Sequence, residues 1–385
     1  MIRTAIVVGL VVASSQLTGC LDFQTAYLNC FDGGRCTVEG AAADASVFLP
    51  DGGTFGDAGE PDGGGEIQDA GARDSGPESD LEPLSWGKFG APSAPAFNAV
   101  HGVSATDLYV AASSGRIFRY SNGSWSEALS NAQSSNDLHG LWVSATGEVY
   151  AGGDGQLVAC RENCGDRESY VVTPVSASIT GMCGAEGLGV YAVGNASVTT
   201  GVLYRFDPGS NGWIPVVPNT GARRNQACWV APNGAVYIAA QATMLRYQTG
   251  VLYSELIHFP SEWTQNDVAN QNFEAVWGDA TRVFAGGSRQ RIIARDSSTG
   301  EWSFVFNPNA ATTILSLEGL PGGEIYAGAL RGSGHQLARL RGGEWSEVSA
   351  GPDLNIFGLW AADTNTWFAV GTDANHTGVI YRGTR

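Results

Sequence analysis

The segment Val190-Tyr-Ala-Val-Gly194 decides the fold, because similar segments recur along the chain. Each is a β-rich run that ends in small residues, and each follows about seven residues after a short apolar stretch. The other members are Leu108-Tyr-Val-Ala-Ala112, Val149-Tyr-Ala-Gly-Gly153, Val236-Tyr-Ile-Ala-Ala240, Val283-Phe-Ala-Gly-Gly287, Ile325-Tyr-Ala-Gly328 and Trp367-Phe-Ala-Val-Gly371.

The apolar stretches that precede these segments set the period of the repeat. They are Phe97-Asn-Ala-Val-His101, Leu138-His-Gly-Leu-Trp142, Ile179-Thr-Gly-Met-Cys183, Asn225-Gln-Ala-Cys-Trp229, Phe273-Glu-Ala-Val-Trp277, Ile314-Leu-Ser-Leu-Glu318 and Ile356-Phe-Gly-Leu-Trp360. Between their last residues the steps are 41, 41, 46, 48, 41 and 42 residues. Units of that length with Gly and Asn turns are typical of β-propeller blades.

The remaining strands complete each unit and predict how the ring closes. A third strand alternates, as in Ile117-Phe-Arg-Tyr120, and a fourth opens with Trp, as at Trp125. The seventh unit reaches Arg385 without a Trp strand, whereas Ser85-Trp86-Gly-Lys-Phe89 supplies one before the first unit. We therefore expect residues 85–385 to form an all-β, seven-bladed propeller of four-stranded blades. The N-terminal strand would close the last blade and remove exposed sheet edges.

The third unit resembles the kelch and galactose-oxidase type of propeller. There Val190-Tyr-Ala-Val-Gly194 precedes Tyr204-Arg-Phe-Asp207-Pro-Gly-Ser-Asn-Gly-Trp213. Most other units lack the double glycine followed by Tyr-Asp, and the Tyr-Cys-His set of the radical-copper oxidases is not found. The resemblance implies the propeller fold alone, because a propeller scaffold does not by itself give a function. We expect no cofactor.

Residues 1–19 are typical of a lipoprotein signal peptide. Arg3 precedes an apolar run of about ten residues, which is too short to span a membrane. Leu17-Thr18-Gly19-Cys20 resembles the lipobox of bacterial lipoproteins. The resemblance implies cleavage before Cys20 and lipidation of its thiol, hence a membrane anchor at the cell envelope, and Leu21 favours the outer membrane. An ordinary signal peptide followed by a chance cysteine is the alternative.

Residues 20–84 are expected to form the lipidated N-terminus and a disordered linker rich in Asp and Gly. The window from Ala41 to Leu84 holds eleven acidic residues against one basic residue, Arg73. Such low hydrophobicity and one-signed charge cannot offset the entropy cost of ordering. The net charge of the whole chain, −17, argues against binding nucleic acid, whereas 43% hydrophobic residues suffice for a folded core.

Cysteine usage is consistent with export. Beyond Cys20 the chain has six cysteines, an even number of the kind expected in an oxidising compartment. We expect Cys30 to pair with Cys36 and Cys160 with Cys164, which leaves Cys183 for Cys228, although fifteen connectivities are possible in principle. A metal site at Cys160 and Cys164 lacks a second pair of ligands, so no metal is expected.

The second position of the apolar stretches is polar in most units and gives the candidate binding site. It holds Asn98, His139, Gln226 and Glu274, and nearby loops add Arg223, Arg224 and Trp263. Amide, guanidinium and indole groups around a concave mouth suit a carbohydrate or a peptide. The alternative interpretation is that Asn and Asp lie there because they favour turns.

These features favour a lipid-anchored, non-catalytic module that binds a ligand or a protein partner. One alternative is a secreted polysaccharide hydrolase or lyase, for which His139 and Glu274 are the weak candidates for an acid–base pair. A scaffold within an envelope complex is the other alternative.

Overall fold

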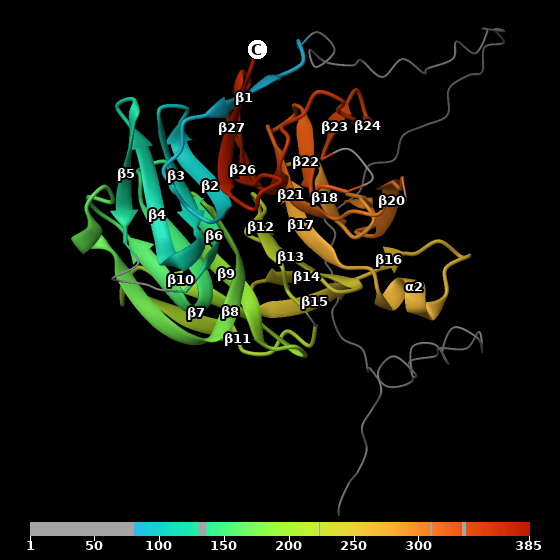
Figure 1. Ribbon diagram of the computed structural model, residues 1–385. Coiled ribbons are helices and arrows are strands. Elements are labelled where there is room, and N and C mark those ends of the chain that lie inside the picture. The colour runs from blue at the N-terminus through green and yellow to red at the C-terminus, as the bar shows by residue number, and fades with distance from the viewer. Residues whose placement is uncertain (1–80, 131–135, 223, 309, 333–335) are drawn as a thin grey trace, which may run out of the picture. The chain divides into compact units, whose positions relative to one another are not determined.

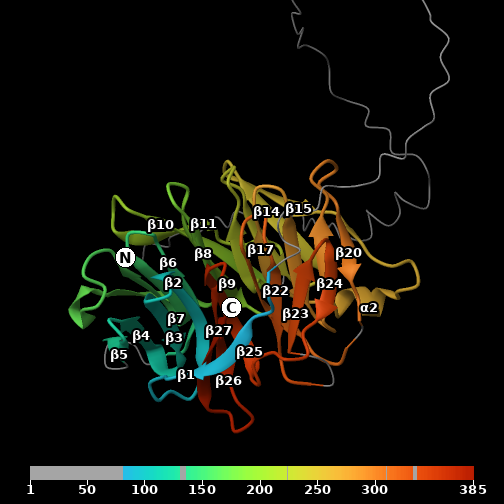
Figure 2. The same cartoon turned by 90° about the horizontal axis from the view of Figure 1, so that it is seen from above.

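The computed structural model describes residues 81–130, 136–222, 224–308, 310–332 and 336–385. Their strands form sheets that follow one another in chain order around a common axis (Figures 1 and 2). Most neighbouring strands within a sheet are antiparallel and consecutive in sequence, so short connections join them.

The first half of the ring contains three sheets. The first holds β2 (Phe97–Ser104), β3 (Asp107–Ala112), β4 (Arg116–Ser121) and β5 (Ser124–Leu129). The second holds β6 (Leu138–Val143), β7 (Val149–Cys160), β8 (Val171–Ala185), β9 (Gly189–Ser197), β10 (Thr200–Asp207) and β11 (Gly212–Val217). The third holds β12 (Ala227–Val230), β13 (Val236–Ala240), β14 (Thr243–Gln248) and β15 (Val251–Glu255).

Three further sheets complete the ring. The fourth holds β17 (Phe273–Gly278), β18 (Val283–Gly287), β19 (Ile292–Arg295) and β20 (Trp302–Phe306), with the short β16 (Ile257–His258) parallel to β20. The fifth holds β21 (Ile314–Gly319), β22 (Ile325–Ala329), β23 (Leu337–Arg341) and β24 (Glu344–Glu347). The sixth holds β25 (Asn355–Asp363), β26 (Thr366–Thr372), β27 (Gly378–Thr384) and β1 (Ser85–Phe89). Helix α2 (Gln265–Ala269) lies between β16 and β17.

The prediction of seven blades is wrong. The described residues form six sheets, because the second and third sequence units share one six-stranded sheet. The first part of β7 pairs with β6 and its last part with β8, while the end of β8 pairs with β9. The chain turns between the two parts of β7 at Gly155, which takes a positive φ of 70°. Oε1 of Glu148 and Nε of Arg161, from the residues that flank β7, are therefore only 3.1 Å apart. Because β8 continues through residues 175–177 from its pairing with β7 to its pairing with β9, it joins the two units in one sheet.

The prediction that the N-terminal strand closes the ring is confirmed. Ser85–Phe89 pairs antiparallel with β27, from Ser85 opposite Thr384 to Phe89 opposite Ile380. Figure 1 shows this blue strand beside the red C-terminal strands. Leu84, just before the predicted boundary of the propeller, is buried in the same core cluster as Trp367. The pairing protects an edge of β27 that would otherwise be free to associate.

The hydrophobic core lies between successive sheets. Tyr109 and Ile117 of the first sheet, for example, share a buried cluster with Leu138 and Val158 of the second. Two of the expected disulfides are present: Cys160 bonds to Cys164, and Cys183 bonds to Cys228 across the inner strands β8 and β12. The signal peptide, Cys20, the pair Cys30 and Cys36, and most of the predicted linker lie outside the described residues.

No helix among the described residues has the length and apolar character needed to cross a membrane. The longest strands instead belong to the six-stranded sheet, where β8 extends over 15 residues. The ring axis is surrounded by the innermost strand of each sequence unit, and the candidate site lies there.

Candidate functional site

A cavity of about 330 Å³ lies on the ring axis. Seven strands or strand ends line it, because each sequence unit contributes its apolar stretch as the innermost strand. The third residue of that stretch is always small, as in Gly140, Gly181 and Ala275. A Cβ atom on Gly140 or Gly181 would lie within 3 Å of the neighbouring inner strand. Small residues therefore let the strands approach closely around the axis.

The second residue of the apolar stretch points toward the cavity in most units, because strand pairing is irregular at that residue. In β6, Leu138 pairs with Gly153 and Gly140 pairs with Gly152, so His139 has no partner of its own. Such a bulge re-aims the extra side chain. The residues at this position in six units are Asn98, His139, Thr180, Glu274, Leu315 and Phe357, and all of them line the cavity. In the fourth unit Gln226 occupies the position, just before β12.

Some polar side chains of this ring also tie neighbouring units together. The amide of Asn98 donates to the carbonyl oxygen of Leu138 at 2.8 Å, and the hydroxyl of Thr180 donates to that of Asn225 at 2.7 Å. Nε2 of His139 lies 3.4 Å from Oδ1 of Asp154. These contacts hold the polar arc of the mouth in a fixed orientation, as a recognition surface requires.

Glu274 is the acidic member of the mouth. Burial raises the pKa of its carboxyl group, and this effect is opposed by the charge of Arg224 and by a hydrogen bond from Gln226. Glu274 and Gln226 therefore form a polar pair within the cavity, with a guanidinium in electrostatic reach. Leu315 and Phe357 complete the ring on the apolar side.

A deeper ring is formed by the fifth position of the stretches. The members that line the cavity are His101, Trp142, Cys183, Trp229, Trp277 and Glu318, and Trp360 has the same position in the seventh unit. The indoles pack between units: a Cβ on Gly184, Gly278 or Gly319 would meet the ring of Trp142, Trp229 or Trp277 within 3 Å. Trp229 also stacks on Tyr237 at a centroid distance of 5.8 Å. The Trp side chains thus serve mainly as packing, and the remaining surface of Trp142, Trp229 and Trp277 forms part of the cavity wall.

The sequence-predicted site residues are only partly brought together. Asn98, His139, Gln226 and Glu274 line the cavity, and Arg224 is near Glu274. Trp263 does not line it, because its ring lies 3.9 Å from the guanidinium of Arg291 and 5.2 Å from the ring of Phe304. Arg223 lies outside the described residues.

The proposed acid–base pair has other partners. His139 contacts Asp154, whereas Glu274 accepts a hydrogen bond from Gln226, although both residues line the same cavity. Among the parts of the chain that the structure describes, no three His, Cys, Asp or Glu side chains gather where they could hold a metal ion.

Two titratable residues of the deeper ring were not singled out from the sequence. Burial raises the pKa of Glu318 to about 8, against hydrogen bonds from the backbone N–H of Gly319 and the indole of Trp277. Burial lowers the pKa of His101 to about 4, and Nδ1 of His101 accepts the N–H of Val143 at 3.2 Å. The sequence could have indicated them, because they occupy the fifth position of the apolar stretches, where four other units have Trp.

No protein-family model matches the chain, and no curated protein is detectably similar to it in sequence. Solved structures share its fold. The extracellular domain of BT4673 from B. thetaiotaomicron has a TM-score of 0.58 at 14% identity, over 79% of this chain. U3-55K has a TM-score of 0.61 at 10% identity, over 79% of this chain and 100% of its own. YCF48 bound to D1 peptide has a TM-score of 0.58 at 14% identity, over 80% and 96%.

These similarities place the chain among β-propeller proteins by fold. The chain spans only 40% of the BT4673 extracellular domain. At such low identity the shared fold carries no activity or partner with it, so function has to be argued from the cavity.

Proposed function

We propose that this protein is an exported, lipid-anchored propeller that binds a peptide segment of a protein partner at the cavity mouth and does not transform it. The observation that carries the proposal is the polar ring of Asn98, His139, Gln226 and Glu274 around a cavity of about 330 Å³. A concave site with a few fixed polar groups on apolar walls is the usual form of a ligand site.

Two further observations support this proposal. Disulfides between Cys160 and Cys164 and between Cys183 and Cys228 suit an oxidising compartment outside the cytosol. YCF48, a propeller of similar fold, is bound to a peptide in its solved structure. A polar arc beside the apolar Leu315 and Phe357 matches a peptide, which offers backbone amides and side chains together.

The anchor is proposed from the lipobox-like Leu17-Thr18-Gly19-Cys20 and is tested on the full precursor. Replacing Cys20 by alanine is expected to move the protein from the membrane fraction to the soluble exported fraction, because the lipid is the proposed attachment. Cell fractionation and mass spectrometry of the N-terminal peptide measure this. A variant that stays in the membrane fraction would contradict the anchor. We also propose that the anchor lies in the outer membrane and that the propeller is related to the kelch type.

Peptide binding is tested by panning a random 12-residue peptide library against the immobilised full chain. We expect enriched peptides whose affinity falls at least tenfold in Glu274→Gln, because that change removes the mouth carboxylate while keeping its shape. Calorimetry measures the affinity, and mass spectrometry of each peptide after incubation detects cleavage.

Trp263→Ala is the matched control, since Trp263 packs on Arg291 away from the cavity. Peptides that bind Glu274→Gln as well as the wild type but lose affinity in Trp263→Ala would move the site to the outer loops. Cleaved peptides would contradict the non-catalytic proposal and direct attention to His139 and Glu274.

A further inference from the structure

The deeper ring of the cavity contains a single carboxylate, and the proposed peptide-binding function does not use it. Glu318 occupies the position where four other units have Trp142, Trp229, Trp277 and Trp360. An indole there packs against the next unit, so a carboxylate gives up apolar packing that the fold otherwise uses. Its presence in the wall of a cavity is therefore a feature to explain.

The surroundings of Glu318 leave its carboxylate directed to the cavity with few partners. The indole N–H of Trp277 and the backbone N–H of Gly319 donate to it. On β22, Tyr326 pairs with Glu318 in register, but its hydroxyl donates to Glu324 at 3.4 Å instead. From β25 the residues that line the cavity are Phe357, Gly358 and Leu359, none of which is charged. A half-buried carboxylate with two neutral donors has the capacity to accept further hydrogen bonds.

The charge of the lining favours a cation. Among the described residues that line the cavity, the titratable ones are Glu318, Glu274, His101 and His139, and none is Lys or Arg. His101 is neutral at physiological pH, because burial lowers its pKa to about 4. Glu274 and the ionised form of Glu318 attract positive charge between low-dielectric walls, and the guanidinium of Arg224 offsets part of this attraction at Glu274 only.

The shape of the lining favours a cation on an aliphatic stem. Glu274 at the mouth and Glu318 in the deeper ring lie three strand positions apart, which is about 10 Å of extended chain. Leu141, Met182 and Leu317 line the cavity between these levels. A four-carbon stem ending in an ammonium group has a similar reach and would bury its methylenes against these side chains.

We propose that Glu318 lies at the bottom of a deep subsite for an alkylammonium group. The group enters through the polar mouth and pairs with the carboxylate of Glu318 beside Trp277. The group is either a lysine side chain of the bound peptide or a free primary amine. The first of these forms rests on the proposed peptide-binding function. Aromatic surface beside the carboxylate adds attraction for the cation.

Binding at this subsite is coupled to proton release. Burial raises the pKa of Glu318 to about 8, so the empty site holds a protonated carboxyl group at pH 6. The cation needs the ionised form, which is the minor form below the pKa and the major form above it. Apparent affinity is therefore expected to rise roughly 50- to 100-fold from pH 6 to pH 8.5, while an alkylammonium stays charged throughout.

Calorimetric titration of the full chain with n-butylammonium chloride tests the subsite, with tryptophan emission as a second readout. We expect saturable binding that strengthens with pH, at least tenfold weaker binding of neutral 1-butanol, and at least tenfold loss without pH dependence in Glu318→Gln. Glu318→Trp, which restores the residue of the other units, is expected to fold and not to bind. Glu301→Gln on the surface is the control that keeps wild-type binding.

Experiments with the selected peptides distinguish the two sources of the cation, and they also distinguish the subsite from the proposed peptide-binding function. Selected peptides that contain lysine and weaken at least tenfold on lysine acetylation support the side-chain source, whereas n-butylammonium binding without any peptide supports a free amine. Peptides that bind wild type and Glu318→Gln equally would overturn the subsite and leave the proposed function standing. Unchanged n-butylammonium binding in both Glu318 variants would also overturn the subsite.

Discussion

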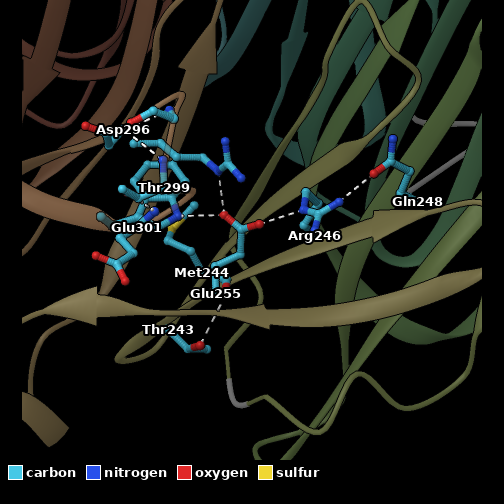
Figure 3. A network of polar contacts seen from close by, with 11 residues as sticks. Thr243, Met244, Arg246, Gln248, Glu255, Asp296, Thr299 and Glu301 are labelled. Carbon is cyan, nitrogen blue, oxygen red and sulfur yellow. Dashed lines mark hydrogen bonds and ion pairs between the residues drawn. The ribbon is translucent and has the colours of Figure 1, made fainter. Parts of the chain in front are cut away.

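Replacing Glu255 by glutamine is expected to lower the free energy of unfolding by about 3 kcal/mol, because a largely buried ion-pair network loses the carboxylate that both of its arginines contact. The carboxylate of Glu255 accepts from Nε of Arg246 at 2.6 Å (Figure 3). The same carboxylate accepts from Nε of Arg295 at 2.7 Å. It also accepts from the indole of Trp302 at 2.9 Å. Glu255 itself is only 5% exposed, so its removal would leave two guanidinium groups poorly compensated.

This network joins two sheets of the ring. Glu255 and Arg246 belong to the third sheet, whereas Arg295 and Trp302 belong to the fourth. Urea unfolding followed by circular dichroism measures the loss as a lower midpoint at unchanged slope. Glu301→Gln is the control, because Glu301 pairs with His258 at an exposed site, and a change within about 0.5 kcal/mol is expected there. Equal stability of the Glu255 and Glu301 variants would show that the network does not hold the sheets together.

Replacing Phe89 by alanine is expected to cost about 3 kcal/mol of stability, because Phe89 anchors the closing strand β1. Its ring makes edge contacts with Tyr120 at 4.9 Å and with Phe368 at 5.6 Å between centroids. Those rings belong to the first and the sixth sheet, so one side chain links both sides of the closure. Nearby, the indole N–H of Trp125 donates to the carbonyl oxygen of Gly90.

Denaturant unfolding and size-exclusion chromatography together test the closure. A weakened β1 exposes the edge of β27, so the Phe89 variant is also expected to self-associate at a lower concentration than the wild type. Val198→Ala is the control, since Val198 is 83% exposed and should change stability by no more than about 0.5 kcal/mol. A Phe89 variant as stable and as monomeric as this control would mean that ring closure contributes little.

The repeat made much of this architecture predictable. The strand predicted from Ser85 to Phe89 has those bounds in the structure, and the segment from Val236 to Ala240 is β13. Alternation and turn residues act locally, so they are legible in sequence. The number of sheets was not predictable, because it depends on whether residues 175–177 interrupt the strand that joins the second and third units.

The candidate site was predictable only in part, for reasons of packing. The second position of each stretch could be identified as polar, and the structure places Asn98, His139, Gln226 and Glu274 at the cavity. Trp263 belongs to a long loop, but its contact with Arg291 holds it elsewhere. Glu318 was hidden in a column that serves packing, because the burial of a carboxylate depends on the surrounding rings and not on its neighbours in sequence.

The most direct test of the central claim, that the axial cavity is the binding site, is calorimetry of the selected peptides with a Leu315→Trp variant. Leu315 lies at the mouth between Glu274 and Phe357 in the order of the ring, and a larger side chain there fills the entrance. The account predicts at least tenfold weaker binding with an unchanged unfolding midpoint. Wild-type affinity in a folded Leu315→Trp variant would contradict it and place recognition on another face of the propeller.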